Sequence, residues 1–389
     1  MEKIKNEIES STSELNSSEK KSSNTDSLLN VAYSFLADLS LVWFFIVIYR
    51  IIPYYTSNLF EVTQNILFSL GVFFTFAGFP LYALMNEQHS KGLIFFKMIS
   101  RVLPQMWLSL QSFSTEKILP MPSITKQEKV ATLFLLVKIF YIPLMLNFAF
   151  SNYRNLVNII QTYITVPTYS ATGFDLNAIM NYIQAVFADF PNIWDPSNFN
   201  FYYYSLAIQL LFFIDTFFFC FGYLFEAEFL GNKVRSVEPT FFGWFVTLMC
   251  YPPFNDITGK YIPGYSNDYA LFADSDFVNM LVRFGLLGLL IIYVWASVAL
   301  GPKASNLTNR GIVDTGPYRF VRHPAYISKN LVWFITTFPV FGFASLLGSL
   351  GTAFIYYLRA ITEERHLIQD PDYQAYCKKV KWRFIPFIY

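Results

Sequence analysis

Residues 310–326 concentrate side chains suited to binding a small ligand, in the order Arg-Gly-Ile-Val-Asp-Thr-Gly-Pro-Tyr-Arg-Phe-Val-Arg-His-Pro-Ala-Tyr. Gly316-Pro317 indicates a turn, and His323 stands directly before Pro324, a residue type favoured in the first turn of a helix. The free N–H groups of such a helix start, with cations beside them, predict an anion site. The cations are Arg319 and Arg322, and the nearby aromatic side chains are Tyr318, Tyr326 and Trp333.

A second polar group, Arg359-Ala-Ile-Thr-Glu-Glu-Arg-His, follows a long apolar stretch. If that stretch crosses a membrane and returns, Arg359 and Glu363-Glu364 emerge on the same side as the Arg-His-Pro loop. An arginine can hold a carboxylate through two parallel hydrogen bonds, but a basic residue here can also anchor a helix end on one side of the membrane. Adjacent residues of a helix face different directions, so we expect only one of the two glutamates in the site.

The composition places both segments in a membrane protein. Of 389 residues, 54% are hydrophobic, 20% aromatic and 14% charged, whereas a soluble domain has about 25% charged residues. A soluble enzyme and an intrinsically disordered protein are both excluded. The net charge of +1 argues against a nucleic-acid partner, and three widely spaced cysteines predict neither a disulfide framework nor a metal site.

We predict an all-α integral membrane protein with about eight transmembrane helices. A span needs about 20 mainly apolar residues. The stretches that qualify are 31–52, 63–85, 130–150, 201–225 and 277–300, a shorter one at 239–255 that either spans or only re-enters, and 325–361, which is long enough for two spans with a break near Gly342.

The basic residues predict which way these helices face. Cytoplasmic loops are enriched in Lys and Arg, and alternation from a cytoplasmic N-terminus places 22 basic residues inside and two, Arg154 and Lys260, outside. Both termini and both polar segments are therefore expected to face the cytoplasm.

Three regions follow along the chain. Residues 1–29 are Ser-rich with mixed charge, which predicts a disordered polar tail. Residues 30–300 predict a bundle of about six transmembrane helices, with an interfacial helix near 92–113 and an outer segment, 151–199, that is too long for a bare linker. Residues 301–389 predict a helical hairpin followed by a cytoplasmic tail.

Three charged residues, Asp38, Lys138 and Asp215, fall inside predicted spans at roughly similar depth. Charges in a bilayer are costly, and they usually pair or line a cavity. Two interpretations are open: a polar cleft for the head group of a substrate, or a structural Lys–Asp pair that joins helices.

Three motifs within residues 301–389 resemble the signature of the isoprenylcysteine carboxyl methyltransferase and phospholipid methyltransferase families. They are Gly316-Pro317-Tyr318-Arg319, Arg322-His323-Pro324-Ala325-Tyr326 and Glu363-Glu364. Both families are integral membrane enzymes that use S-adenosylmethionine. The resemblance implies this cofactor and a membrane lipid or lipidated molecule as methyl acceptor, without a metal. It leaves the exact acceptor and the oligomeric state open.

The resemblance also implies roles for individual residues. In the family, the His and Tyr of the loop and a downstream Glu contact the cofactor, while an Arg five residues before that Glu handles the substrate carboxylate. Arg359 and Glu364 have this spacing and are expected to be catalytic. The implied cofactor-binding residues are Tyr318, Arg322, His323, Pro324, Tyr326 and Glu364.

Two alternatives remain. Residues 376–389 resemble the tail of the membrane sterol reductases, which share this C-terminal architecture but bind NADPH. Against a reductase, Arg322-His323 is followed by Pro where those enzymes have Asn, and Glu363-Glu364 stands where they have an Asp-Glu pair before a Cys. The third possibility is a non-enzymatic membrane protein that keeps the fold.

Overall fold

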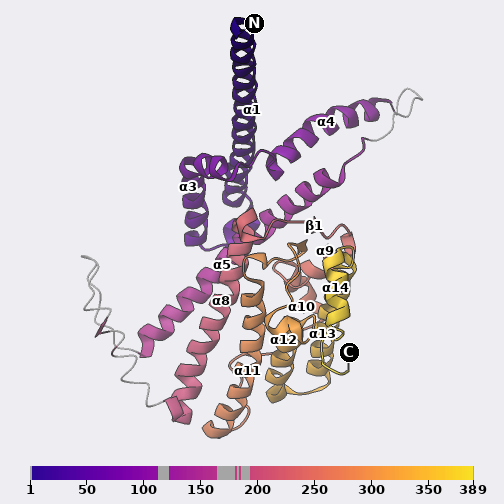
Figure 1. Cartoon of the computed structure of the whole chain (residues 1–389). Helices are drawn as coiled ribbons and strands as arrows, with labels where there is room; N and C mark the ends of the chain where they lie inside the picture. The colour runs from indigo at the N-terminus through magenta and orange to yellow at the C-terminus, as the bar shows by residue number, and fades with distance from the viewer. Residues whose placement is uncertain (1, 113–121, 164–179, 182–183, 185–192, 389) are drawn as a thin grey trace. The chain divides into compact units, whose positions relative to one another are not determined.

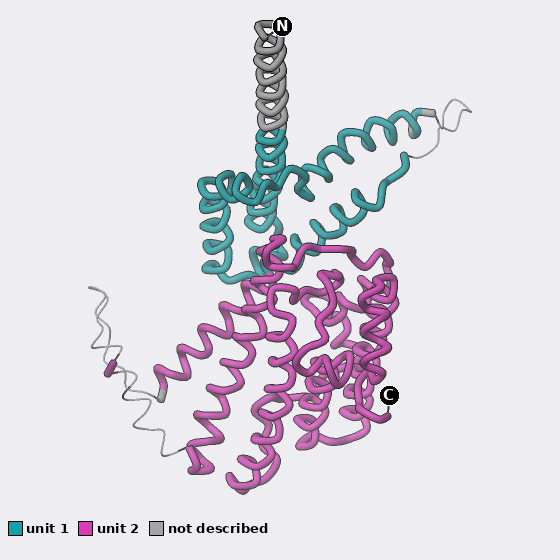
Figure 2. The backbone as a smooth tube through the Cα atoms, viewed as in Figure 1, with its two compact units in different colours: residues 1–143 teal, residues 144–389 magenta. Residues whose placement is uncertain are grey.

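The computed structural model describes residues 2–112, 122–163, 180–181, 184 and 193–388, with the backbone alone for residues 2–26, 110, 112 and 163. The chain divides into two compact units, Met1–Pro143 and Leu144–Tyr389 (Figure 2). Helices dominate both units (Figure 1), and the sheet found in the described part of the chain has two strands. The predicted all-α class is confirmed.

Six of the described helices are long and apolar enough to cross a membrane. They are Ser27–Ile51, Glu61–Met85, Lys126–Thr162, Pro196–Leu224, Asp276–Lys303 and Phe343–Leu367. Each contains or overlaps a predicted apolar stretch. The protein is therefore a multi-pass integral membrane protein.

The prediction of eight spans is not confirmed, because two of the predicted spans are short helices. The stretch 239–255 contains α9 (Phe241–Leu248) and the start of α10 (Phe254–Tyr261). Pro252-Pro253 lies between them, and proline cannot continue a helix because it lacks the N–H group. In the predicted hairpin, α12 (Pro324–Thr336) has 13 residues, fewer than the roughly 20 that a span needs.

The described part of the first unit consists mainly of helices. They are α1 (Glu2–Ile51), α2 (Pro53–Asn58), α3 (Glu61–Met85), α4 (Lys91–Ser112) and the first part of α5 (Lys126–Tyr163). The backbone of α1 is helical from Glu2, whereas the sequence predicts a disordered tail over 1–29. Extending an existing helix costs far less than starting one, so the apolar part of α1 can propagate into the polar stretch. Helix α4 occupies the stretch predicted as an interfacial helix; its position at the interface stays a prediction.

Asp38 has a structural role within this first unit. It accepts a hydrogen bond from the Gly92 backbone N–H at 2.9 Å and another from the Tyr82 hydroxyl, so it joins α1 to α3 and α4. Lys138 attracts it electrostatically. These contacts agree with the structural interpretation of the buried charges for Asp38 and Lys138.

The second unit carries the rest of the chain from Leu144. Its elements are the end of α5, α7 (Pro196–Asn198), the π-helical turn η2 (Phe199–Tyr203), α8 (Tyr204–Leu224), η3 (Glu228–Leu230), β1 (Ser236–Val237), α9, α10, α11 (Asp276–Leu300), η4 (Gly301–Lys303), β2 (Thr308–Asn309), η5 (Gly316–Arg319), α12, η6 (Phe338–Val340), α13 (Phe343–Leu367) and α14 (Pro371–Lys379). Side chains of α8, α11 and α12 form its main hydrophobic core, which includes Ile208, Leu286, Leu290 and Val332. Part of the predicted outer segment 151–199 lies outside the described residues.

The two strands join the segment that follows α8 to the segment that follows α11. Strand β1 pairs antiparallel with β2, with Ser236 opposite Asn309. Asn309 then donates a hydrogen bond to Asp370 at 2.7 Å, just before α14. Burial alone would raise the pKa of Asp370, but hydrogen bonds from Asn309, from the Asp372 N–H and from Arg235 lower it below its usual value. This carboxylate therefore stays ionised at neutral pH and links the strands to the C-terminal helix.

A close approach at Gly222 predicts a measurable effect on stability. A Cβ atom at this position of α8 would overlap the backbone oxygen of Ala304, so Gly222→Ala forces the helix and the segment around Ala304 apart. We expect a loss of about 1–3 kcal/mol, measured as a lower midpoint of thermal unfolding in detergent. Gly288→Ala on α11 is the matched control, because nothing lies within 4 Å of its Cβ position. An equal loss in both variants would contradict the close approach.

Candidate active site

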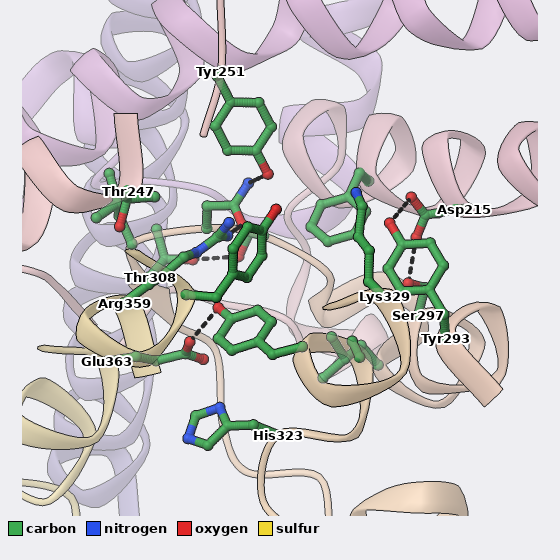
Figure 3. Close-up of a pocket in the computed structure, with 18 of the residues that line it drawn as sticks. Asp215, Thr247, Tyr251, Tyr293, Ser297, Thr308, His323, Lys329, Arg359 and Glu363 are labelled. Carbon is green, nitrogen blue, oxygen red and sulfur yellow. Dashed lines mark hydrogen bonds between the residues drawn. The ribbon is translucent and has the colours of Figure 1, made fainter. Parts of the chain in front are cut away.

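A cavity of about 310 Å³ lies inside the second unit (Figure 3). Residues from α8, α9, α11, α12 and α13 line it, together with residues 145–152 of α5 and the segment 305–308. Pockets that bind small molecules usually measure about 300–1,000 Å³ and combine apolar walls with a few convergent polar groups. This cavity fits that description, since its walls carry both aromatic rings and charged side chains.

The Arg-His-Pro loop enters one end of this cavity in a fixed position. The backbone N–H of Arg322 donates to the oxygen of Trp382, and that of His323 donates to the oxygen of Arg383, both at 2.9 Å. Pro324 is buried and occupies the first position of α12, where its missing N–H is not needed. These two backbone hydrogen bonds to the C-terminal tail therefore fix the position of His323.

One face of α12 continues the wall from this loop. His323, Tyr326 and Lys329 follow each other at intervals of three residues, which places them on one side of the helix start. The His323 ring stacks on the Tyr326 ring, with centroids 5.2 Å apart and planes 13° apart. The stack gives the cavity a flat aromatic surface.

Helix α13 contributes the opposing wall through residues three or four positions apart. Tyr356, Arg359, Glu363 and His366 line the cavity. Arg359 is 7% exposed, donates a hydrogen bond to Asn306, and lies 5.1 Å from the centre of the Tyr326 ring. Glu363 accepts a hydrogen bond of 2.6 Å from the Tyr326 hydroxyl, so the polar groups of α12 and α13 meet inside the cavity.

Glu364 is close to His323, but it is not among the residues that line the cavity. Its Oε1 atom lies 3.1 Å from His323 Nε2 and 3.4 Å from Arg322 Nε, and its Oε2 atom accepts from Arg383 Nε at 2.9 Å. Both carboxylate oxygens are thus engaged by this chain's own cations and imidazole. The structure places Glu363 on the cavity wall and Glu364 behind the His-Pro loop.

The remaining residues of the predicted site lie around the same loop. Tyr318 and Arg322 line the cavity, and the Tyr376 hydroxyl donates to the Tyr318 carbonyl at 2.7 Å. Burial raises the pKa of the Tyr318 phenol, which therefore stays protonated. Arg319, which the sequence placed beside an anion site, is exposed and lies over the Phe320 ring at 4.7 Å instead.

The far end of the cavity holds a second polar group that the sequence only partly indicates. Asp215 on α8 accepts hydrogen bonds from the Tyr293 hydroxyl at 2.6 Å and from the Ser297 hydroxyl, both on α11. Figure 3 shows these three residues at one side of the cavity with Lys329 beside them. Of the three charged residues that fall inside predicted spans, Asp215 therefore lines a cavity, which agrees with the interpretation as a polar cleft.

Glu238 forms part of the wall between β1 and α9. It is 3% exposed, and its Oε1 atom accepts a hydrogen bond of 3.0 Å from Arg365. Its buried Oε2 atom has no hydrogen-bond partner among the described residues. A buried carboxylate oxygen without a donor is costly, so a donor from a bound ligand fits here.

Sequence reasoning missed Lys329 and Glu238, and it assigned the site role to Glu364 rather than to its neighbour Glu363. Helical spacing could have found Lys329 and Glu363, because each follows a predicted site residue of its own helix by three or four positions. Nothing local marks Glu238, which the pairing of β1 with β2 brings to the wall. Among the described residues, no group of three or more His, Cys, Asp and Glu could hold a metal ion.

Apolar helices long enough to cross a membrane, and a cavity that combines cations, carboxylates and stacked rings, are the features of a membrane protein with a candidate ligand site. Residues 284–369, less than a quarter of the chain, match the sequence model of the isoprenylcysteine carboxyl methyltransferase (ICMT) family. No curated protein and no solved structure matches the chain.

The family match confirms the resemblance found in the C-terminal motifs and identifies this region as similar to a family of membrane methyltransferases. It includes all of α12 and α13 and most of α11, and therefore His323, Tyr326, Lys329, Arg359 and Glu363. The comparisons give no support to the sterol reductase alternative.

Proposed function

We propose that the protein is an S-adenosylmethionine-dependent methyltransferase that acts on a lipophilic acceptor bearing a carboxylate. The observation that carries this proposal is the meeting, in one cavity, of the His323–Tyr326 stack with Arg359 and Glu363 of α13. All four residues lie in the region that matches the methyltransferase family.

The residues present fit a nucleoside that carries a positive charge. The His323–Tyr326 surface can stack on a purine, and the carboxylates of Glu363 and Glu238 can accept hydrogen bonds from ribose hydroxyls or an amino group. When bound, the cofactor supplies an electrophilic methyl group: its sulfur–methyl bond breaks as a bond from the methyl carbon to the acceptor oxygen forms. An ionised acceptor needs no proton transfer, so the residues act by binding and alignment.

Arg359 is the group that would hold the acceptor carboxylate. Its guanidinium is buried among Tyr251, Tyr326 and Tyr356, and a buried guanidinium can bind a carboxylate through two hydrogen bonds. Holding the reacting atoms at about 3–3.5 Å in the correct orientation supplies much of the rate of such a reaction. The enclosing rings also exclude water, which would otherwise compete for the Arg359 donors.

The apolar part of the acceptor would lie toward α5 and α8. Met145, Phe148, Phe212 and Phe219 line the cavity on that side, and they offer a hydrophobic surface to a lipid chain. The distribution of basic residues supports a cytoplasmic position for the cofactor end, where Lys378, Lys379 and Lys381 follow α13.

Binding of S-adenosylmethionine tests the proposal directly. We expect the purified full-length protein in detergent to bind the radiolabelled cofactor, and His323→Ala to weaken that binding at least about tenfold, since it removes half of the stacked surface and the partner of Glu364. The measurement is equilibrium binding, together with the thermal stabilisation that a true ligand produces by mass action.

The matched control is His89→Ala, because His89 is an exposed histidine of the first unit. It should bind the cofactor as the unmodified protein does. If the unmodified protein shows neither binding nor stabilisation, the proposal fails and a non-enzymatic role for the fold is favoured.

A further inference from the structure

Lys329 is a second cation that faces the cavity from α12. It lies six residues after His323 and among the residues that line the cavity. The side chain is only partly accessible. The groups that act on its charge are Asp215 of α8, Tyr293 of α11 and Arg359 of α13. Figure 3 shows it between the Asp215 group and the side of the cavity that holds Arg359.

The immediate neighbours of the Lys329 ammonium are aromatic. The nitrogen lies 5.0 Å from the centre of the Tyr293 ring and 5.0 Å from that of the Trp333 ring. These contacts attract a cation, but they satisfy none of its three N–H donors. Among the described residues, no hydrogen bond and no ion pair within 4.0 Å is found for this nitrogen, although an ammonium is costly to bury without acceptors.

Asp215 does not supply the missing acceptor. It attracts Lys329 electrostatically, but its two oxygens each accept a hydrogen bond from a hydroxyl, of Tyr293 and of Ser297. A lysine and an aspartate that formed a closed structural pair would instead meet at hydrogen-bond distance.

Besides Arg322, which lies 3.4 Å from Glu364, the cavity wall holds Arg359 as a further cation. Like Lys329, Arg359 forms no ion pair within 4.0 Å among the described residues. Its charge and that of Lys329 repel each other. Two like charges enclosed at low dielectric are unfavourable unless an anion binds between them. A bound anion that contacts both cations would therefore offset this repulsion.

We propose that Lys329 acts with Arg359 to bind the carboxylate of the methyl acceptor and thereby determines that the acceptor is an anion. This inference rests on the proposed function and adds a specificity-determining residue to it. The two cations select an acid over a neutral or cationic lipid of the same chain, because only an anion offsets their repulsion.

Matched pairs of acid and amide test this assignment without the need for turnover. The probes are N-acetyl-S-farnesylcysteine and its carboxamide, and palmitate and palmitamide, each added to the full-length protein in detergent. We expect at least one acid to bind about 10- to 100-fold more tightly than its amide, because hydrogen bonds to charged groups have this effect. Lys329→Met should remove most of that preference by weakening the acid and leaving the amide unchanged.

Three further variants make the result decisive. Lys329→Arg should keep the preference for the acid, whereas Lys329→Gln, a second neutral variant that retains a polar end, should lose it. Lys378→Met is the matched control, because Lys378 is exposed on α14, and it should behave as the unmodified protein does. Equal binding of acid and amide by the unmodified protein, no binding of any probe, or an unchanged preference in both neutral variants would overturn the inference.

Failure of this inference and failure of the proposed function give different results. If Lys329 has no role with the acceptor, the unmodified protein and Lys329→Met still bind S-adenosylmethionine equally. If the protein is not a methyltransferase, cofactor binding is missing in both proteins, while the comparison of acid with amide still reports on Lys329.

Discussion

Arg359→Met is expected to lower kcat/KM for methyl transfer about 30-fold or more while S-adenosylmethionine still binds. Truncating one partner of a buried, hydrogen-bonded charge pair costs about 2 kcal/mol or more, and each 1.36 kcal/mol is a factor of ten in rate. Methionine fills a similar length but offers no donor. The measurement is transfer of the radiolabelled methyl group to the acid probe, with cofactor binding followed in parallel.

The large effect expected for Arg359→Met follows from the burial of Arg359 without a nearby anionic side chain among the described residues. Arg359 is 7% exposed, and it forms no ion pair with a carboxylate among the residues that the structure describes. Its hydrogen bond to Asn306 leaves further guanidinium donors for a ligand, because a guanidinium has five N–H groups. Buried arginines are almost always paired, so the acceptor carboxylate supplies the expected partner.

Arg359→Lys separates this role from that of a membrane anchor. Lysine keeps the positive charge that the orientation of α13 would require, but it lacks the planar fork that binds a carboxylate bidentately. We expect Arg359→Lys to lose activity almost as Arg359→Met does. Full activity of Arg359→Lys, together with a loss of membrane insertion in Arg359→Met, would instead identify an anchor.

The membrane helices could be predicted wherever an unbroken apolar stretch exceeded the thickness of a bilayer. Helices α3, α8 and α11 fall where hydropathy places them. Hydropathy could not show that 239–255 divides into α9 and α10, because the mean value over the stretch does not register the break at Pro252-Pro253. Hydropathy also overestimated the length of α12, because this helix ends at Thr336.

The sequence could predict only those site residues that belong to a motif of neighbouring residues. The Arg322-His323-Pro324 loop and Arg359 are neighbours in space, as two segments on one membrane face should be. Asp215 and Lys329 depend on the packing of α8 against α11 and of α11 against α12, which no local spacing specifies. The family spacing that implied Glu364 also could not show which glutamate the helix turns toward the cavity.

Glu363 and Glu364 are adjacent, yet we expect their substitutions to have different effects: loss of Glu364 should mainly lower stability, and loss of Glu363 should mainly weaken cofactor binding. Glu364→Ala should destabilise the protein by about 3–5 kcal/mol, because it leaves Arg322 and Arg383 facing each other with no anion. Glu364 is 7% exposed, so water does not replace the lost charge. Thermal unfolding in detergent measures this loss, and cofactor binding should fall with it because the His323 ring loses its support.

Glu363→Ala should lower the stability much less, because Glu363 is exposed and the substitution removes only the hydrogen bond from the Tyr326 hydroxyl, a contribution of about 0.5–1.5 kcal/mol. It should nevertheless weaken S-adenosylmethionine binding about tenfold, through the lost acceptor on the cavity wall. The two variants are matched controls for each other, because they remove the same group one residue apart.

Glu364→Gln decides between the geometry and the spacing of the family motif. If Glu364 touches the cofactor, as that spacing implies, the neutral isostere should fold normally and lose cofactor binding. If it acts through His323 and the two arginines, the loss of charge should lower stability first, and cofactor affinity should fall only as the loop loosens. Higher salt should then narrow the difference in stability between Glu364→Gln and the unmodified protein, because salt screens the repulsion between the partly exposed Arg322 and Arg383.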